Sequence, residues 1–341
     1  MSTYRVLFIA NTQFNFWNFR KEIIKQHLTR GNQVCLLAPR NKKYQFKYES
    51  HDNLSKISWD SKGAILDLII GYFYILRYKF YEIDYIFSFT LYGNILASLV
   101  AVHSKNFYWI ANVTGLGRLY RGFWKKSYLS FYKKIVSSSD KVLLQNKRDF
   151  NLFNDHKNAH IIFGSGINLN EFLPKDKLNS KVTRVCFIGR VIAHKGVYAL
   201  CKAFLLQKNK SLELNIYGEG DTKKLRQLYG DRINFHGFHN NIKDVYANHD
   251  AIIFPSSYAE GIPRVLIESC ACSLIICPPS LLGMDIFQKN KKLILQTLNV
   301  DEIVRVFDCL SNLTELEIKN IHLYTLKLRD KLNVLQVLCY Y

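Results

Sequence analysis

The sequence predicts an α/β protein made of two doubly wound domains, each built on a parallel sheet. Strand-like apolar runs alternate with helical patterns from end to end, which is the signature of a parallel sheet with crossover helices. The alternation restarts after a short polar segment, residues 174–181. The length of 341 residues also favours two domains, and the apolar content of 48% is ample for two cores.

Each expected element follows from its residue pattern. In the first half, short apolar runs predict strands at residues 6–10, 33–38, 85–89, 107–110 and 141–145. Apolar residues spaced three and four apart predict helices at residues 20–29, 64–80, 94–103 and 128–138.

The second half repeats this scheme. Strands are expected at residues 185–188, 213–217, 234–236, 251–254 and 274–277. Helices are expected at residues 197–204, 300–310 and 323–337.

Two carboxylates flank a Gly-x-Pro turn behind the strand at residues 251–254. Glu260 is expected on the loop at the carboxyl end of that strand, and Glu268 one or two turns inside the next helix. Ligands of open α/β sheets bind at this edge, and the first N–H groups of a helix favour anions such as phosphate. Taken alone, the segment fits equally well a solvated helix start, with Glu260 near the positive end of the helix dipole.

Two cations follow the strand at residues 185–188. Arg190 and Lys195 are expected at its carboxyl end, in the loop before the next helix. A planar guanidinium and a compact ammonium suit a diphosphate, although most Lys and Arg side chains are ordinary solvated charges. With Glu260 and Glu268 they form a coherent set, because cations bind a diphosphate and carboxylates bind hydroxyl groups.

These motifs resemble a known family. Gly189-Arg190 with Lys195-Gly196, followed by the segment from Glu260 to Glu268, is similar to the retaining nucleotide-sugar glycosyltransferases of family 4. That family has the GT-B fold, in which two Rossmann-like domains face a cleft. Further segments similar to the family occur in its order, at residues 11–20, 113–117, 164–172, 218–221 and 235–238.

The resemblance implies an enzyme of bacterial-type surface-polysaccharide assembly. Its reaction is the transfer of a hexosyl unit from a nucleoside diphosphate sugar to a lipid-linked saccharide, without a metal or other cofactor. An acceptor- and membrane-facing domain is expected at residues 1–174, a donor domain at residues 175–325, and a last helix at residues 326–341 that returns to the first domain. The expected location is the cytoplasm, at the inner face of the cell membrane.

The resemblance also assigns roles to residues. Arg190 and Lys195 stabilise negative charge on the departing diphosphate, Glu260 binds and orients the donor sugar, and Glu268 accepts hydrogen bonds from the ribose diol. Further donor contacts are expected from Gly189, Gly218, Glu219, Phe238, Gly261 and Ile262. Acceptor-side or membrane contacts are expected from Asn11, Thr114, Gly115, Lys125 and Lys126.

Three segments depart from the family pattern. Residues 11–14 stand where many members have a Gly-Gly pair, and residues 89–93 stand where many have a histidine. The residues after Cys277 also differ from the usual loop. The family's acceptor contacts in the first domain therefore transfer only in part, and an enzyme of reduced activity stays open.

The net charge of +20 is uneven, with 24 Lys and Arg against 11 Asp and Glu in residues 1–174. Residues 118–134 carry six cations and six aromatic side chains without an acidic residue. This composition fits an amphipathic helix on an anionic membrane, while a helix whose rings enter the domain core stays open. Interleaved cations and rings also occur in single-strand nucleic-acid platforms, but we expect no nucleic-acid partner.

Composition disfavours several other classes. No run of 18 uncharged apolar residues occurs, so no membrane-spanning helix is expected, and no signal-peptide pattern follows Met1. The eight cysteines include no Cys-x-x-Cys pair and are expected as reduced core residues. The sequence has no Asp-x-Asp metal clamp, so the diphosphate needs another source of positive charge.

Three other functions are compatible with this sequence. A nucleotide-sugar epimerase can share the two-domain fold, and a nucleotide-sugar sensor would bind the donor without turnover. A nucleic-acid-binding protein would explain the charge but not the carboxylate pair. Product analysis without an acceptor, turnover measurements and the salt dependence of binding separate these functions.

Overall fold

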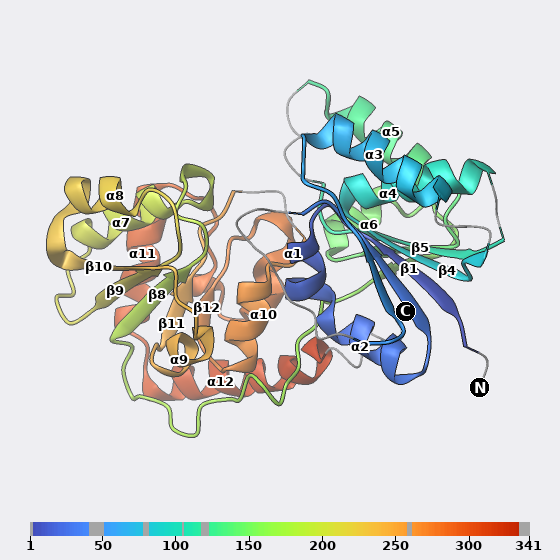
Figure 1. Ribbon diagram of the computed structural model, residues 1–341. Coiled ribbons are helices and arrows are strands. Elements are labelled where there is room, and N and C mark those ends of the chain that lie inside the picture. Colours follow the sequence, from blue (N-terminus) through green and yellow to red (C-terminus); the bar gives the residue numbers. More distant parts are fainter. Residues whose placement is uncertain are drawn as a thin grey trace. The chain divides into compact units, whose positions relative to one another are not determined.

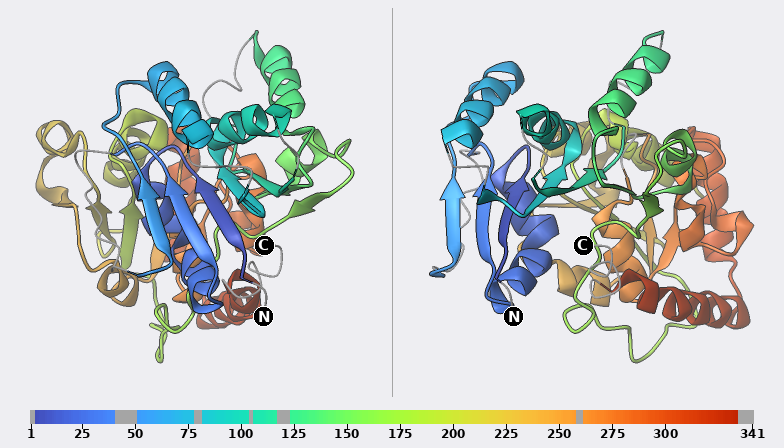
Figure 2. Two further views of the ribbon diagram at one scale, coloured as in Figure 1. Left: turned by 45° about the vertical axis from the view of Figure 1, so that its right-hand side comes forward. Right: turned by 90° about the vertical axis from the view of Figure 1, so that its right-hand side faces the viewer.

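The computed structural model describes residues 3–40, 51–77, 82–103, 106–116, 123–257 and 261–333, with the backbone alone at residues 281–283. The chain divides into two compact units, the first ending at Ser165 and the second beginning at Gly166. Each unit holds one parallel sheet with helices packed on it (Figures 1 and 2). The predicted pair of doubly wound, Rossmann-like domains is confirmed.

The first unit contains a seven-stranded sheet in the order β3-β2-β1-β4-β5-β6-β7. Its strands are β1 (Arg5–Ile9), β2 (Gln33–Leu37), β3 (Leu54–Ile57), β4 (Tyr85–Phe89), β5 (Tyr108–Val113), β6 (Lys141–Leu144) and β7 (Ala159–Ile161). The strand order reverses between β1 and β4, which makes the carboxyl ends of these two strands the topological switch point. The edge strands β3 and β7 were not predicted, because their residues are mostly half-buried and form no continuous apolar run.

Helices cover both faces of this sheet. After β1 the chain forms α1 (Gln13–Asn15), the π-helical turn η1 (Phe16–Arg20) and α2 (Lys21–Thr29). Figure 1 shows α2 on one side of the strands and longer helices on the other. These are α3 (Ala64–Arg77), α4 (Thr90–His103) and α5 (Lys125–Val136), and the short α6 (Lys147–Leu152) follows β6. The largest core of the unit lies between the sheet and α3 to α5, around the buried rings of Trp109 and Tyr132.

The second unit contains a five-stranded sheet in the order β10-β9-β8-β11-β12. All five strands were predicted to within one or two residues at each end. They are β8 (Arg184–Ile188), β9 (Glu213–Tyr217), β10 (Ile233–Gly237), β11 (Ala251–Ile253) and β12 (Ile275–Cys277). The helices are α7 (Val197–Leu206), α8 (Thr222–Tyr229), α9 (Ile242–Ala247), α10 (Arg264–Ala271), α11 (Val300–Ser311) and α12 (Glu315–Arg329). Here the switch point lies between β8 and β11.

The last helix differs from the prediction. It begins at Glu315 rather than Leu323, because Thr314 and Glu317 form a capping box at its start. It ends at Arg329 and is followed by a 3-10 turn, Asp330–Leu332, so the helix predicted at residues 323–337 is α-helical only as far as Arg329. Residues 334–341 lie outside the described residues.

Two expectations from composition concern the state of the cysteines and the presence of membrane-spanning helices. The seven cysteines in the described ranges are free thiols, and six of them are buried, as core residues would be. Cys339 lies outside those ranges. No helix within the described part of the chain has both the length and the apolar character needed to cross a bilayer.

Candidate active site

The carboxyl edge of the second sheet carries the two predicted cations. After β8 the chain passes Arg190, turns through the 3-10 helix Ala193–Lys195 and enters α7. Arg190 is exposed, whereas Lys195 is only 8% exposed. The Nζ of Lys195 lies 5.2 Å from the centre of the ring of Phe254, the residue that follows β11. Lys195 therefore brings a cation, largely withdrawn from water, to the switch point between β8 and β11.

The loop that carries Arg190 is held against the loop after β9. The backbone N–H of Val191 donates to the carbonyl oxygen of Glu219 at 2.8 Å. Gly218 has a φ of +142°, and a Cβ atom there would lie 1.8 Å from the carbonyl oxygen of Gly189. Only glycine permits this approach, so the predicted glycines fix the two loops side by side.

The turn that carries Lys195 is fastened to the segment after β11. The backbone N–H and the hydroxyl of Ser257 both donate to the carbonyl oxygen of His194, at 3.1 and 3.2 Å. This segment leads to Glu260, which lies outside the described residues. The chain resumes with the buried residues Gly261 and Ile262 just before α10.

Glu268 lies in α10, as predicted, and is buried. Both of its oxygens accept hydrogen bonds: Oε1 from Arg264 Nε at 2.6 Å, and Oε2 from Tyr246 Oη at 2.7 Å. Burial, together with the neighbouring Glu268 carboxylate, raises the pKa of Tyr246 well above its usual range, so its hydroxyl stays protonated and remains a donor. Each carboxylate oxygen keeps a second lone pair, which leaves room for two further donors such as a pair of hydroxyls.

Tyr246 and Arg264 were not predicted. The spacing of Arg264 and Glu268, four residues apart on one helix, is a signal that the sequence does contain. Tyr246 precedes Glu268 by 22 positions, and its contact exists only because the fold brings a side chain of α9 to one of α10.

The remaining donor-side predictions fall at the same edge of this sheet. Glu219 follows β9 and is exposed, and Phe238 follows β10 and is 62% exposed. The structure thus brings together residues predicted from four separate segments. They are Gly189, Arg190, Lys195, Gly218, Glu219, Phe238 and Glu268.

The acceptor-side predictions lie in the first unit. Asn11 follows β1 closely and is exposed, while Thr114 and Gly115 follow β5 and are half-buried. All three therefore lie at the carboxyl edge of the first sheet. Lys125 and Lys126 begin α5 and are exposed.

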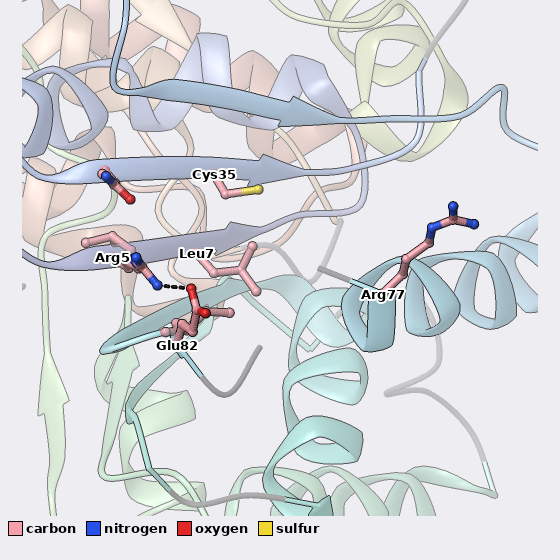
Figure 3. Close-up of a pocket in the computed structure, with 8 residues that line it drawn as sticks. Arg5, Leu7, Cys35, Arg77 and Glu82 are labelled. Carbon is pink, nitrogen blue, oxygen red and sulfur yellow. Dashed lines mark hydrogen bonds and ion pairs between the residues drawn. The ribbon is translucent and has the colours of Figure 1, made fainter. Parts of the chain in front are cut away.

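A hollow of about 400 Å³ in the first unit lies at the opposite edge of the sheet (Figure 3). It is lined by the amino ends of β1 and β2, and the guanidinium of Arg5 pairs there with the carboxylate of Glu82. Ligands of open α/β sheets bind at the carboxyl ends of the strands, so this hollow is separate from the candidate site.

Part of the second unit matches a known family model. Residues 182–307 match the family model described as glycosyl transferases group 1. Over this range the chain is similar to glycosyltransferases. The matched range contains Arg190, Lys195, Gly218 and Glu268, and the family resemblance drawn from the sequence is confirmed.

The chain is similar to relatives of known name and known structure. It is 25% identical over 307 residues to the N,N'-diacetylbacillosaminyl-diphospho-undecaprenol alpha-1,3-N-acetylgalactosaminyltransferase of Campylobacter jejuni, covering 80% of this chain and 79% of that protein. Sucrose-phosphate synthase of Thermosynechococcus elongatus has a TM-score of 0.80 at 15% identity, over 98% of this chain and 97% of the other. Anabaena Alr3699/HepE in complex with UDP and glucose has a TM-score of 0.77, with the same identity and coverage. These structures show that the fold is GT-B.

Proposed function

We propose that this glycosyltransferase moves a hexosyl unit from a nucleoside diphosphate sugar to a lipid-linked saccharide, with retention of configuration, in surface-polysaccharide assembly. The name of the Campylobacter jejuni relative supports the acceptor class, because it describes a sugar linked to diphospho-undecaprenol. The UDP and glucose held by the Anabaena protein support the donor class. The proposal includes no metal ion or other cofactor.

The observation that carries this proposal is the buried cation of Lys195 at the switch point of the donor sheet, beside the loop of Arg190. As the bond between sugar and diphosphate breaks, negative charge grows on the departing phosphate oxygens. Fixed cations stabilise that charge more strongly in the transition state than in the ground state, and this difference accelerates the reaction.

The carboxylates bind the donor in this proposal. Glu268 accepts hydrogen bonds from the ribose diol with the lone pairs that Tyr246 and Arg264 leave unused. Glu260 binds the hydroxyls of the donor sugar and orients it. The acceptor hydroxyl then attacks from the face that the diphosphate leaves, and the departing phosphate receives its proton. Attack on that face retains the anomeric configuration.

We also propose that the first unit rests on the anionic inner surface of the membrane. Lys125 and Lys126 are exposed on α5, and Phe123 and Trp124 immediately before them are 90% and 70% exposed. Rings at headgroup depth with cations on lipid phosphates describe an interfacial helix. Tyr132 of the same helix is fully buried, so the alternative of a core-facing ring holds for that residue. Residues 117–122 lie outside the described ranges.

A second apolar surface of the first unit supports the same proposal, although the sequence did not predict it. Helix α3 packs beside α4 and turns large apolar side chains to solvent. They are Ile65, Leu66, Ile69 and Phe73, each 48% to 77% exposed. Extended exposed apolar surfaces mark interaction sites with proteins or membranes.

A screen of nucleotide sugars for thermal stabilisation, followed by product analysis, tests the proposed reaction. A ligand at 100 times its Kd stabilises the folded state by about 2.7 kcal/mol, so a true donor raises Tm measurably. We expect one nucleoside diphosphate sugar to do so and then to label a lipid-linked saccharide. Isomerisation of the donor without an acceptor would indicate an epimerase, and binding without turnover would indicate a sensor.

A further inference from the structure

The carboxyl edge of the first sheet contains a group of polar residues that the donor chemistry does not use. It lies at the switch point between β1 and β4, where open α/β sheets bind ligands. The first turn of α4 lies directly against the end of β1, because a Cβ atom on Gly93 would come within 2.7 Å of the carbonyl oxygen of Ile9. The N–H groups that begin α4, a helix of 14 residues, therefore lie next to the end of β1.

Thr90, the first residue of α4, has a strained backbone. Its φ is +68°, which is rarely adopted by a residue branched at Cβ. The other described non-glycine residue with positive φ, Ser273, follows the end of α10, where this conformation is common. Thr90 instead joins a strand to a helix, and strain of this kind concentrates at functional sites. Its Oγ1 is buried and forms no hydrogen bond within the described residues.

Arg20 places a cation at the same edge. It is 4% exposed, and its Cζ lies 4.2 Å from the centre of the ring of Phe89, the residue before Thr90. It ends the π-helical turn Phe16–Arg20, and such turns are frequent at functional sites. Its planar guanidinium has the donor geometry that matches a phosphate.

Asn15 completes the group. It is 9% exposed, and its Nδ2 donates to Oδ1 of the exposed Asn11 at 3.3 Å. Its own Oδ1 is buried and accepts no hydrogen bond from the described part of the chain. Buried polar atoms are nearly always paired, so an amide oxygen left in this state indicates a donor supplied by a ligand.

We propose that Arg20, Thr90 and Asn15 bind the phosphate-bearing sugar of the acceptor, an inference that rests on the proposed transferase function. Arg20 and the first N–H groups of α4 bind the phosphate. The hydroxyl of Thr90 donates to a phosphate oxygen, and Oδ1 of Asn15 accepts from a sugar hydroxyl. The acceptor is thereby recognised by the sugar–phosphate junction as well as by its lipid.

A pair of soluble acceptor analogues tests this assignment by isothermal titration. One is a hexose 1-phosphate with a short alkyl chain on the phosphate, and the other is the alkyl hexoside without phosphate. We expect the wild type to bind the phosphate compound at least about tenfold more tightly. Arg20→Gln raises its Kd by about 10- to 100-fold, the range for hydrogen bonds to a charged group, and removes this preference.

Matched variants separate a binding role from a structural one. Thr90→Val keeps the branched shape and the backbone strain but loses the hydroxyl, so it weakens binding, whereas Thr90→Ser retains wild-type affinity. Lys21→Gln removes an exposed cation next to Arg20, one that lies over the ring of Trp17, and leaves the Kd unchanged. If Arg20→Gln does not fold, titration of the wild type with the phosphate analogue must still shift the amide NMR resonance of Thr90.

Equal binding of the two analogues by the wild type would overturn the proposal, and so would an unshifted Thr90 resonance at saturation. Inorganic phosphate that competes as strongly as the analogue would overturn the part played by the sugar. Binding of nucleoside diphosphate sugars to the second unit is measured in the same samples. A failure of that binding would contradict the proposed function, whereas a failure confined to the acceptor analogues would contradict this site alone.

Discussion

Tyr246 donates a 2.7 Å hydrogen bond to Glu268 and so joins α9 to α10 inside the donor unit. Arg264 holds the second oxygen of the same carboxylate at 2.6 Å. With both oxygens fixed, the carboxylate offers its remaining lone pairs in a set direction, so the Glu268 side chain loses less conformational entropy when a ligand binds. Tyr246 and Arg264 therefore position Glu268 in the proposed contact with ribose.

Tyr246→Phe should weaken donor binding without slowing the chemical step. Loss of one hydrogen bond to a charged group raises the donor KM by about tenfold, while kcat stays near that of the wild type because a ribose contact is present before and during reaction alike. Steady-state kinetics with varied donor measure both constants. Tyr324→Phe is the matched control, since it loses a 2.7 Å bond to the carbonyl oxygen of Ile286 instead. A fall in kcat at unchanged KM would contradict the positioning role.

Arg190→Ala and Lys195→Ala should each lower turnover by about 10²- to 10³-fold, the scale of losing one electrostatic donor to developing charge. Turnover is measured with saturating donor, and circular dichroism checks that the variants are folded, because Lys195 is buried. Lys202→Ala, at an exposed position of α7, serves as the control. Near-normal turnover in either variant would show that the substituted residue does not stabilise the departing diphosphate.

Gly218→Ala should disrupt the paired loops of the donor edge. Its Cβ atom would overlap the carbonyl oxygen of Gly189, so the loop must open and the bond from Val191 to Glu219 is lost. We expect a destabilisation of about 1–3 kcal/mol together with weaker donor binding. Gly230→Ala has a similarly unusual φ of +69° but no atom within 4 Å of the added Cβ, so it separates backbone strain from steric overlap. Equal effects of the two variants would contradict this explanation.

Stability should fall as the pH is lowered from 7 to 5, in part through His27. Burial, and secondarily the charge of Arg30, lower the pKa of His27 to about 4, and its Nδ1 lies 3.0 Å from Nδ2 of Asn32. Between the unfolded pKa near 6.5 and the folded value, the unfolded chain binds a proton that the native state excludes. The free energy of unfolding therefore decreases as pH falls, by at most about 1.4 kcal/mol per pH unit for this residue.

Urea unfolding of the wild type and of His27→Gln at pH 7 and pH 5 measures this effect. We expect a smaller loss of stability in the variant, because glutamine does not titrate. An identical loss in the two proteins would show that other groups cause the dependence.

Lys125→Glu combined with Lys126→Glu should release the protein from anionic liposomes at physiological salt. Each cation near the surface contributes about 1 kcal/mol, and the double reversal turns attraction into repulsion. Sedimentation with liposomes measures binding, while the affinity for nucleotide sugar stays unchanged. Lys223→Glu combined with Lys224→Glu, an adjacent exposed pair on α8, is the matched control. If anionic liposomes retained the Lys125/Lys126 variant as well as the wild type, these two lysines would not contribute to membrane binding.

The strands were the most predictable elements, because buried parallel strands are short continuous apolar runs. β9 has the bounds expected from its sequence, whereas the half-buried edge strands β3 and β7 gave no such signal. The start of α12 is also encoded, since Thr314 and Glu317 have the spacing of the capping box that they form.

The candidate site was predictable where a strand, a loop and a helix follow one another. Arg190, Lys195 and Glu268 lie where that order places them. The contact of Tyr246 with Glu268 depends on how two helices pack, and the backbone strain at Thr90 depends on how α4 meets the end of β1. Neither relationship is encoded in a local pattern, so each required the three-dimensional structure.

Retaining transfer to a lipid-linked saccharide is tested most directly by the anomeric configuration of the product. The wild-type enzyme is incubated with the donor that stabilises it and with a short-chain lipid-linked saccharide, and the new linkage is assigned by NMR from its anomeric coupling constants. We expect a new glycosidic bond on the acceptor with the same anomeric configuration as the sugar had in the donor. An inverted linkage, or a bound donor that yields no acceptor-linked product, would contradict the proposed reaction.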